Sequence, residues 1–321
     1  MLHPPAETAF GADLARHWAG GEPWLLMEQA VVTYTEPRMV AKRPGEITRL
    51  SLSHIARGSR GAMFFQWRAS RGGAELWHSG MVPHAGPDSR IFREVCALGA
   101  LLPTLGEATR APVEAEAAVL WDTEAGWALQ SPGLPSTELS YREAVRQAHR
   151  VLYRHGVTAD FAHPSDDLSA YGFVLVPSLY LISDADAENL RRYVEGGGTL
   201  VVSFLSGVAD EHARPRTDVP VPDSPGPHAP RTDAPGTGAA LAGLPAITRH
   251  RHGGGTALYL STRLTDGAYT RLLGLEPVPV ERVRRGGWLF TINHGDEEQE
   301  GTGGLRLSPG GYAVQKVQPG V

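Results

Sequence analysis

The sequence predicts an α/β protein in which short apolar strands alternate with amphipathic helices. Two observations carry this prediction. Apolar runs and segments of helical period follow one another from Phe10 to Leu273, and from about Val278 short apolar runs are separated only by glycine-rich turns. With 321 residues the chain can form two or more domains, each with its own core. We therefore expect an open, mostly parallel sheet wrapped by helices, followed by a small antiparallel β domain.

Residues 1–112 form the first predicted domain and contain two strands and three helices. Apolar residues recur at helical spacing in each predicted helix, and glycines end the first of them. The two strands are short apolar runs, which predicts that both are buried. In order, the elements are a helix at Phe10–Ala19, a strand at Trp24–Met27, a helix from Gly45 to Ile55, a strand at Ala62–Trp67 and a helix at Ser89–Leu102.

Residues 113–275 continue the alternation and are predicted to form a second domain. Ser140 with Glu143, and Ser183 with Asp186, are expected to cap two helices that end at glycines. Within this domain, residues 213–238 are dense in proline and glycine, which predicts a disordered linker. The predicted strands are Ala117–Trp121, Val157–Phe161, Phe173–Val176, Thr199–Leu205 and Thr256–Leu260, and a further helix is predicted at Asp266–Leu273.

Residues 276–321 are predicted to form the small antiparallel β domain. Three apolar runs, at Trp288–Ile292, Gly304–Leu307 and Tyr312–Val317, are separated by turns that contain glycine. The segment contains no stretch of helical period, so its runs are expected to pair with one another.

Composition excludes several classes of function. A net charge of -5, from 30 basic and 35 acidic residues, provides no basic field for nucleic acid or an anionic membrane. Cys96 is the one cysteine, so neither a disulfide nor a thiolate metal site is expected, and no cofactor motif is present. His250 and His252 alternate with arginines, which does not favour a metal site. Because the first residues resemble no signal peptide and no run approaches a membrane span, a cytoplasmic protein is expected.

Glu28 is the main candidate for chemistry from its position. It directly follows the predicted strand Trp24–Met27. A β/α barrel places its catalytic groups at the carboxyl ends of parallel strands, because those ends converge on one mouth. The alternative from position alone is that Glu28 begins a solvated loop, since most acidic residues are exposed.

Three motifs carry a resemblance to a known family: Met27-Glu-Gln29, Phe64-Phe-Gln-Trp-Arg68 and AELWHSGMVPHAG from Ala74 to Gly86. In this order they resemble the C-terminal part of the catalytic barrel of glycoside hydrolase family 42 β-galactosidases. The resemblance implies that residues 1–112 are the last strands of a (β/α)8 barrel. It also implies that residues 113–275 are a trimerisation domain with a flavodoxin-like fold similar to glutamine amidotransferases, and that the chain assembles as a homotrimer.

The same resemblance assigns roles to individual residues. It implies that Glu28 is the nucleophile of a retaining glycosidase, which attacks the anomeric carbon while a second carboxylic acid protonates the leaving oxygen. Glu75 and His78 match positions that bind galactose hydroxyls. Phe65 and Trp67 are candidates for an apolar platform under the sugar, with packing inside the barrel as an equal alternative.

The sequence departs from the family pattern in two places. It contains no Asn-Glu dipeptide, which is where the family carries its general acid/base, and Tyr34-Thr-Glu-Pro37 stands where the family has Asn-Trp. No cysteine follows Cys96, so amidotransferase chemistry is absent even if that fold is shared.

Two hypotheses of function follow. The first is a C-terminal portion of a β-galactosidase that is inactive alone and acts on galactosides once the missing barrel half supplies the acid. The second is a non-catalytic oligomerisation or sugar-binding protein derived from that family.

Overall fold

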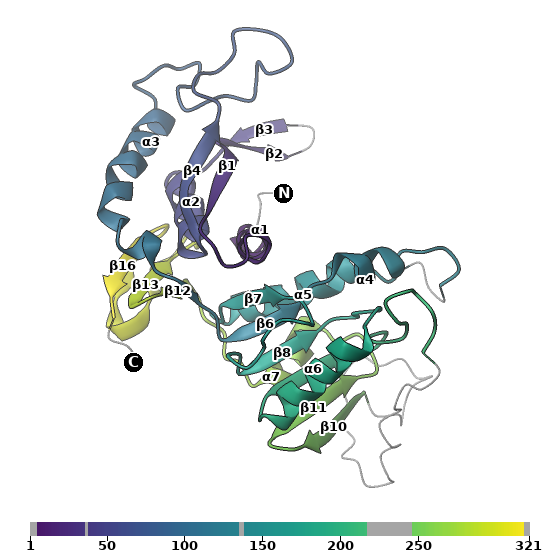
Figure 1. Cartoon of the computed structure of the whole chain (residues 1–321). Coiled ribbons are helices and arrows are strands. Elements are labelled where there is room, and N and C mark those ends of the chain that lie inside the picture. The colour runs from purple at the N-terminus through teal and green to yellow at the C-terminus, as the bar shows by residue number, and fades with distance from the viewer. Residues whose placement is uncertain (1–4, 36–37, 135–137, 217–245, 318–321) are drawn as a thin grey trace. The chain divides into compact units, whose positions relative to one another are not determined.

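A computed structural model describes residues 5–35, 38–134, 138–216 and 246–317 (Figure 1). They divide into two compact units. The first unit comprises Met1–Glu114, Tyr153–Thr158 and Pro277–Val321, and the second comprises Ala115–Leu152 and Ala159–Glu276. Most of the predicted linker, from residue 217 onward, lies outside the described residues. Within the described ranges, no helix is both long and apolar enough to cross a membrane.

The first unit begins with the predicted alternation of helices and strands, which the structure confirms. β1 and β4 pair in parallel, with Ala30 beside Phe65, and α2 lies against them through its buried face (Figure 1). Ser89 caps α3 by accepting a hydrogen bond from the amide of Phe92. The elements are α1 (Pro5–Trp18), β1 (Trp24–Ala30), α2 (Glu46–Ala56), β4 (Ser59–Phe65), α3 (Arg90–Leu101), and the short 3₁₀ turns Leu102–Leu105 and Ala108–Arg110.

The expected burial of both strands is wrong for one face of the pair. Side chains on this face remain 45%, 66% and 44% exposed at Leu25, Met27 and Met63. On the other face Gln29 is buried and bonds to Ser51 of α2. Two strands have only one helical layer to pack against here, so the apolar residues of the second face have no partner of their own among the described elements.

A hairpin between β1 and α2 was not predicted. β2 (Val32–Thr35) and β3 (Arg38–Ala41) pair antiparallel, and the residues that join them lie outside the described ranges. Tyr34 and Thr35, the first half of the segment that departs from the pattern of the resembled family, lie in β2, and Glu36 and Pro37 lie outside the described residues.

The C-terminal residues form the predicted antiparallel sheet, and this sheet belongs to the first unit. Its strand order is β16-β13-β12-β5. Ile55 and Ala56 of α2 pack against Val283 and Phe290 of this sheet. The strands are β5 (Val113–Glu114), β12 (Glu281–Arg285), β13 (Trp288–Ile292) and β16 (Tyr312–Lys316), beside a small pair of β14 (Gln299–Glu300) and β15 (Arg306–Leu307) with the 3₁₀ turn Thr302–Gly304.

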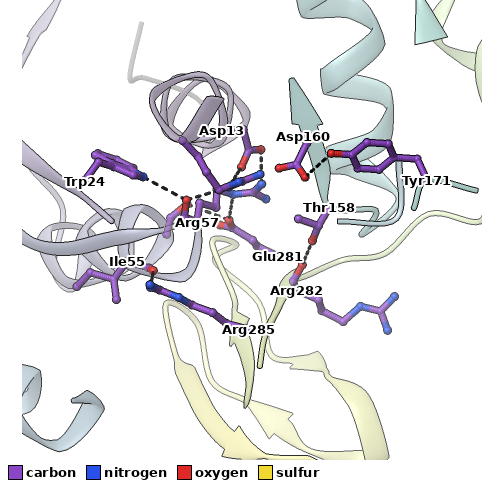
Figure 2. Close-up of polar contacts among 12 residues, drawn as sticks. Asp13, Trp24, Ile55, Arg57, Thr158, Asp160, Tyr171, Glu281, Arg282 and Arg285 are labelled. Carbon is purple, nitrogen blue, oxygen red and sulfur yellow. Dashed lines mark hydrogen bonds and ion pairs between the residues drawn. The ribbon is translucent and has the colours of Figure 1, made fainter. Parts of the chain in front are cut away.

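A buried ionic network joins the helices of the first unit to this sheet (Figure 2). The Arg57 guanidinium, at the end of α2, binds the Asp13 carboxylate of α1 and lies 2.8 Å from Oε1 of Glu281 on β12. His294 Nε2 lies 2.7 Å from the other Glu281 oxygen. Burial alone would raise the pKa of Glu281, but Arg57 and His294 lower it to about 2. Glu281 is therefore an anion whose charge is matched within the fold.

The second unit contains the predicted open sheet, whose strand order is β10-β11-β9-β8-β6-β7. All pairs are parallel except β10 with β11, so the sheet is mostly parallel as expected. Ser183 caps α6 as predicted, and Glu143 donates its amide to Ser140 at the start of α5. The strands are β6 (Ala117–Leu120), β7 (Ala159–Ala162), β8 (Phe173–Val176), β9 (Thr199–Ser203), β10 (Ile247–His252) and β11 (Gly255–Leu260), and the helices are α4 (Thr123–Ala128), α5 (Tyr141–Arg154), α6 (Asp184–Glu195) and α7 (Asp266–Leu273).

The Glu281 network predicts a large stability effect. Glu281→Gln removes one of the two carboxylate charges that hold Arg57, and breaking one side of a buried ion pair costs on the order of 3 kcal/mol. We expect this loss in the free energy of unfolding, measured by urea titration with tryptophan fluorescence, which reports mainly on the first unit because five of the seven tryptophans belong to it. The control is Glu298→Gln, whose partner Arg306 is exposed, and its effect should stay below about 0.5 kcal/mol. Equal effects of the two variants would contradict a structural role for the network.

Candidate functional site

Glu28 lies near the carboxyl end of β1, two residues before the last residue of the strand. The strand continues to Ala30, and its pairing with β4 is irregular between Leu26 and Gln29. Glu28 occupies this irregular stretch and is exposed. Because β1 and β4 are parallel neighbours, Glu28 shares one edge of the pair with Phe65, the last residue of β4. The edge that these two strand ends form is the candidate site.

The structure brings three of the predicted site residues together beside this edge. The rings of Phe65 and His78 lie edge to face, with centroids 6.2 Å apart and planes at 71°. His78 Nδ1 in turn contacts the Glu75 carboxylate. The side chains of Glu75 and His78 are 47% and 42% exposed, so both retain atoms that a ligand can reach. A carboxylate and an imidazole held in this way present hydrogen-bond acceptors and a donor in fixed positions.

The loop after β4 is folded back on its own start, and this holds Glu75 and His78 near Phe65. The amide of Met81 donates to the carbonyl of Gln66 at 2.7 Å, and the amide of Val82 donates to the carbonyl of Trp67 at 2.8 Å. Gly80 is required at this closure, because a Cβ there would lie 2.8 Å from the Gln66 oxygen. The AELWHSG motif therefore lies in a loop whose two ends are joined by backbone hydrogen bonds.

Two tryptophans of this loop are exposed. Trp67 is 64% exposed and meets Phe92 edge to face, with ring centroids 6.1 Å apart. Trp77 is 70% exposed and lies against His84 at 5.8 Å. Neither ring is packed in a core among the described residues. Trp77 was not among the predicted site residues, although its place in the same motif as Glu75 and His78 was a usable signal.

A cavity of about 360 Å³ adjoins Glu28 within the first unit. It is bounded by the end of β1, by the hairpin and by one side of α2. The polar side chains that line it include Lys42, Glu46 and His54, none of which the sequence analysis had selected. None of the three belongs to a recognised motif: Glu46 and His54 are brought to Glu28 by the packing of α2 against β1, and Lys42 by the hydrogen bond of its amide to Val31.

Burial controls the charge of two residues in this cavity. It lowers the pKa of Lys42 to about 8, although the Glu46 carboxylate acts in the opposite direction. Burial likewise lowers the pKa of His54 to about 4, against the attraction of Glu281. His54 Nδ1 has no hydrogen-bond partner within the described ranges, and its ring meets Trp24 edge to face at 5.9 Å. His54 is therefore neutral near pH 7.

The candidate site can bind a ligand that carries hydroxyl groups and can place a carboxylate beside it. Glu28 offers an exposed carboxylate, and Glu75, His78 and the nearby rings offer polar and apolar contacts. No cluster of three or more histidine, cysteine, aspartate or glutamate side chains that could hold a metal ion occurs in the part of the chain that the structure describes.

Comparison with known proteins identifies related sequences. A family model described as "Beta-galactosidase" matches residues 2–105, and one described as "Beta-galactosidase trimerisation domain" matches residues 115–227. A β-galactosidase from Arthrobacter sp. is 38% identical over 340 residues, which cover 90% of this chain and 49% of the relative. The β-galactosidase BgaB from Geobacillus sp. (strain Y412MC61) is 35% identical, covering 92% and 52%. The chain thus spans about half the length of these relatives.

Solved structures show the same relationship. A β-galactosidase from Bacillus circulans sp. alkalophilus aligns with a TM-score of 0.80 at 26% identity, covering 99% of this chain and 57% of that one. A β-galactosidase from Rahnella sp. R3 aligns with a TM-score of 0.83 at 25% identity, covering 99% and 59%. The alignments cover almost the whole chain in each case.

The neutral state of His54 predicts how stability depends on pH. The pKa of His54 is about 4 in the fold against 6.5 in the unfolded chain. The contribution of neutral His54 to the free energy of unfolding is therefore complete above pH 6.5 and is lost as pH falls through 4. Between pH 7 and pH 5 the loss should be about 2 kcal/mol. Urea unfolding at several pH values should show this slope, and His54→Leu should flatten it. His212→Asn, at an exposed histidine, should leave the slope unchanged. A wild-type slope that His54→Leu does not alter would contradict the assignment.

Proposed function

The chain belongs to the glycoside hydrolase family 42 β-galactosidases, as the C-terminal part of their catalytic domain with their trimerisation domain, and on this basis we propose that it supplies the nucleophile of a retaining galactosidase site. The nucleophile is Glu28. The observation that carries the proposal is the shared edge of β1 and β4. There Glu28 adjoins β4, which ends at Phe65 and leads into the loop with Glu75 and His78.

In the proposed mechanism, the Glu28 carboxylate attacks the anomeric carbon of a terminal β-D-galactoside and forms a glycosyl-enzyme ester that water then hydrolyses. Glu28 is exposed, so its oxygens can reach a sugar. Glu75 and His78 hold neighbouring hydroxyls of the galactose, and their mutual contact fixes the direction of each. The Phe65 and Trp67 rings provide the apolar surface for the sugar ring.

The acid that protonates the leaving group comes from further barrel strands. A retaining glycosidase needs a second carboxylic acid about 5 Å from the nucleophile, and the sequence has no Asn-Glu to match the family's acid. Two strands cannot close a barrel. The exposed side chains of Leu25, Met27 and Met63 are what the interior of a barrel would cover, which supports additional strands on this face. We propose that these strands complete the site.

The second unit is proposed to assemble the protein into a trimer rather than to do chemistry. Its family match is to a trimerisation domain, and its mostly parallel sheet fits the flavodoxin-like, amidotransferase-like fold that the resemblance implies. No cysteine follows Cys96, so this unit has no thiol nucleophile. A non-catalytic assembly or sugar-binding protein is the alternative function, favoured by the absence of the Asn-Glu acid from the sequence.

Hydrolysis of an aryl β-galactoside tests the proposed role of Glu28. The chain alone should be inactive, because losing a general acid costs about 10²- to 10⁴-fold and the missing strands also position the substrate. Mixing it with a polypeptide that carries the preceding barrel strands of a relative should restore turnover. Glu28→Gln should abolish that restored activity, whereas the exposed Glu22→Gln should keep it.

Either of two results would contradict this proposal. Activity of the chain alone that disappears in Glu28→Gln would mean that a residue of this chain supplies the proton. Restored activity that survives Glu28→Gln would exclude Glu28 as nucleophile. A folded, complemented trimer without activity would favour the non-catalytic alternative.

Galactose binding tests the roles of Glu75 and His78. Glu75→Gln and His78→Asn should each weaken binding about tenfold, because each removes one charged or ring-nitrogen partner of a hydroxyl. The double variant should lose less than the sum of the two free-energy changes, since the residues contact each other. Saturation-transfer NMR measures the affinity, with His212→Asn as the control. Additive effects would indicate that the two side chains act independently.

A further inference from the structure

Lys42 is an unusual residue of the first unit. The chain has two lysines, Lys42 and Lys316, against 28 arginines. The backbone of Lys42 is fixed on both sides, since its amide donates to the Val31 carbonyl at 3.3 Å and its carbonyl accepts from Arg90 at 2.6 Å. The residue is only 7% exposed, and it lines the cavity beside Glu28. A buried lysine at the wall of a cavity requires a physical explanation.

The amine of Lys42 has no hydrogen-bond partner within the described ranges. Its charged and titratable neighbours at the cavity are Glu28 of β1 and Glu46 and His54 of α2. Of these, Glu46 is already engaged, because its Oε2 accepts from the Arg43 amide at 2.7 Å. His54 is neutral. No ion pair within the described ranges compensates the burial of this amine, so the site disfavours the charged form.

We propose that Lys42 is a nucleophilic amine that forms an imine with small aldehydes entering this cavity. Three observations support the assignment: the burial of the side chain, the lack of a hydrogen-bond partner, and a neighbouring cavity of about 360 Å³, which is within the range of small-molecule sites. The lowered pKa of about 8 agrees with them, because it makes a usable fraction of the amine neutral at pH 7.

The reaction balances without any oxidant or reductant. The neutral amine of Lys42 attacks the aldehyde carbon, and the carbonyl oxygen takes up a proton to give a carbinolamine. The C–O bond then breaks, the oxygen leaves as water, and the C=N bond of the imine forms. Both protons that the oxygen gains come from the Lys42 nitrogen, and solvent can carry them between the two atoms. Water reverses the reaction, so the adduct is in equilibrium with the free aldehyde.

The class of natural ligand follows from the proposed function, on which this part of the inference rests. Hydrolysis of a galactoside releases an aldose, and the open-chain form of an aldose carries an aldehyde. Lys42 would then be a site at which the released sugar modifies the protein that produces it. The amine chemistry itself does not depend on this source.

Lys316 is a matched internal control. Its side chain is 67% exposed, and its ammonium is 2.9 Å from Glu107 and 5.0 Å from the centroid of the Trp288 ring. Lys316 is thus an exposed and paired lysine, whereas Lys42 is buried and its pKa is lowered by that burial. Both lysines experience the same reagent in the same tube, so their relative labelling removes differences in concentration and time.

Reductive trapping tests the proposal. The chain is treated at pH 7 with glycolaldehyde and sodium cyanoborohydride, which reduces imines to stable secondary amines, and labelling is measured at each lysine by peptide mass spectrometry. Lys42 should label at least about tenfold faster than Lys316, since at pH 7 the neutral fraction of Lys42 is on the order of 10²-fold above that of a lysine in a model peptide, while access through the cavity is restricted. The rate at Lys42 should level off above about pH 8.

Three further arms complete the experiment. In urea both lysines should label at equal rates. Lys42→Arg should remove the fast label and leave that of Lys316 unchanged. Galactose in place of glycolaldehyde should add to Lys42 first, while galactitol, which has no carbonyl, should add to neither. Lys42 labelling no faster than Lys316 in the folded chain, or a rate that keeps rising to pH 10, would overturn the proposal. Because the aldehyde is added directly, the result is independent of whether the protein hydrolyses galactosides.

Discussion

The first unit depends on one buried cation. Arg57 is 2% exposed and is held between the carboxylates of Asp13 and Glu281, which come from the two ends of the sequence. Burial would by itself lower the pKa of Arg57, yet the two carboxylates raise it, so the guanidinium is charged at every accessible pH. This geometry fixes where α1, α2 and β12 meet. Since α2 also packs against β1 through Ser51 and Gln29, the position of the strand that carries Glu28 follows from the same contact.

The candidate site has two parts of different character. The loop with Glu75 and His78 is closed by its own backbone hydrogen bonds and keeps its geometry locally. Glu28, by contrast, lies on a strand whose second face is open. The loop of the proposed sugar-binding residues is therefore preformed, while the surroundings of the proposed nucleophile depend on what covers that open face.

Sequence alone predicted most elements of both units. Predictions were most accurate where capping residues or glycines mark an end, as with Ser183 at α6 and Ser89 at α3. They failed for β12 and β10, because Glu-Arg-Val-Arg-Arg and Ile-Thr-Arg-His-Arg-His lack the apolar alternation of a strand. β12 buries charges that distant residues neutralise, and β10 is an edge strand facing solvent. At the site, Glu28, Phe65, Glu75 and His78 could be selected through motifs, whereas the cavity beside Glu28 could not. Its walls come from segments that only the fold brings together.

The first unit is built from three separate stretches of the sequence, and this affects the order in which its parts can fold during synthesis. The strands β12, β13 and β16 of its sheet emerge from the ribosome only after all of the second unit. The second unit is nearly contiguous and can fold while synthesis continues, but Arg57 must wait for Glu281. Until then the helices α1 and α2 carry a cation with one counter-charge and an uncovered apolar face. In nascent chains α1 and α2 therefore stay exposed to chaperones and proteases until β12 has been made, even when the second unit is already complete.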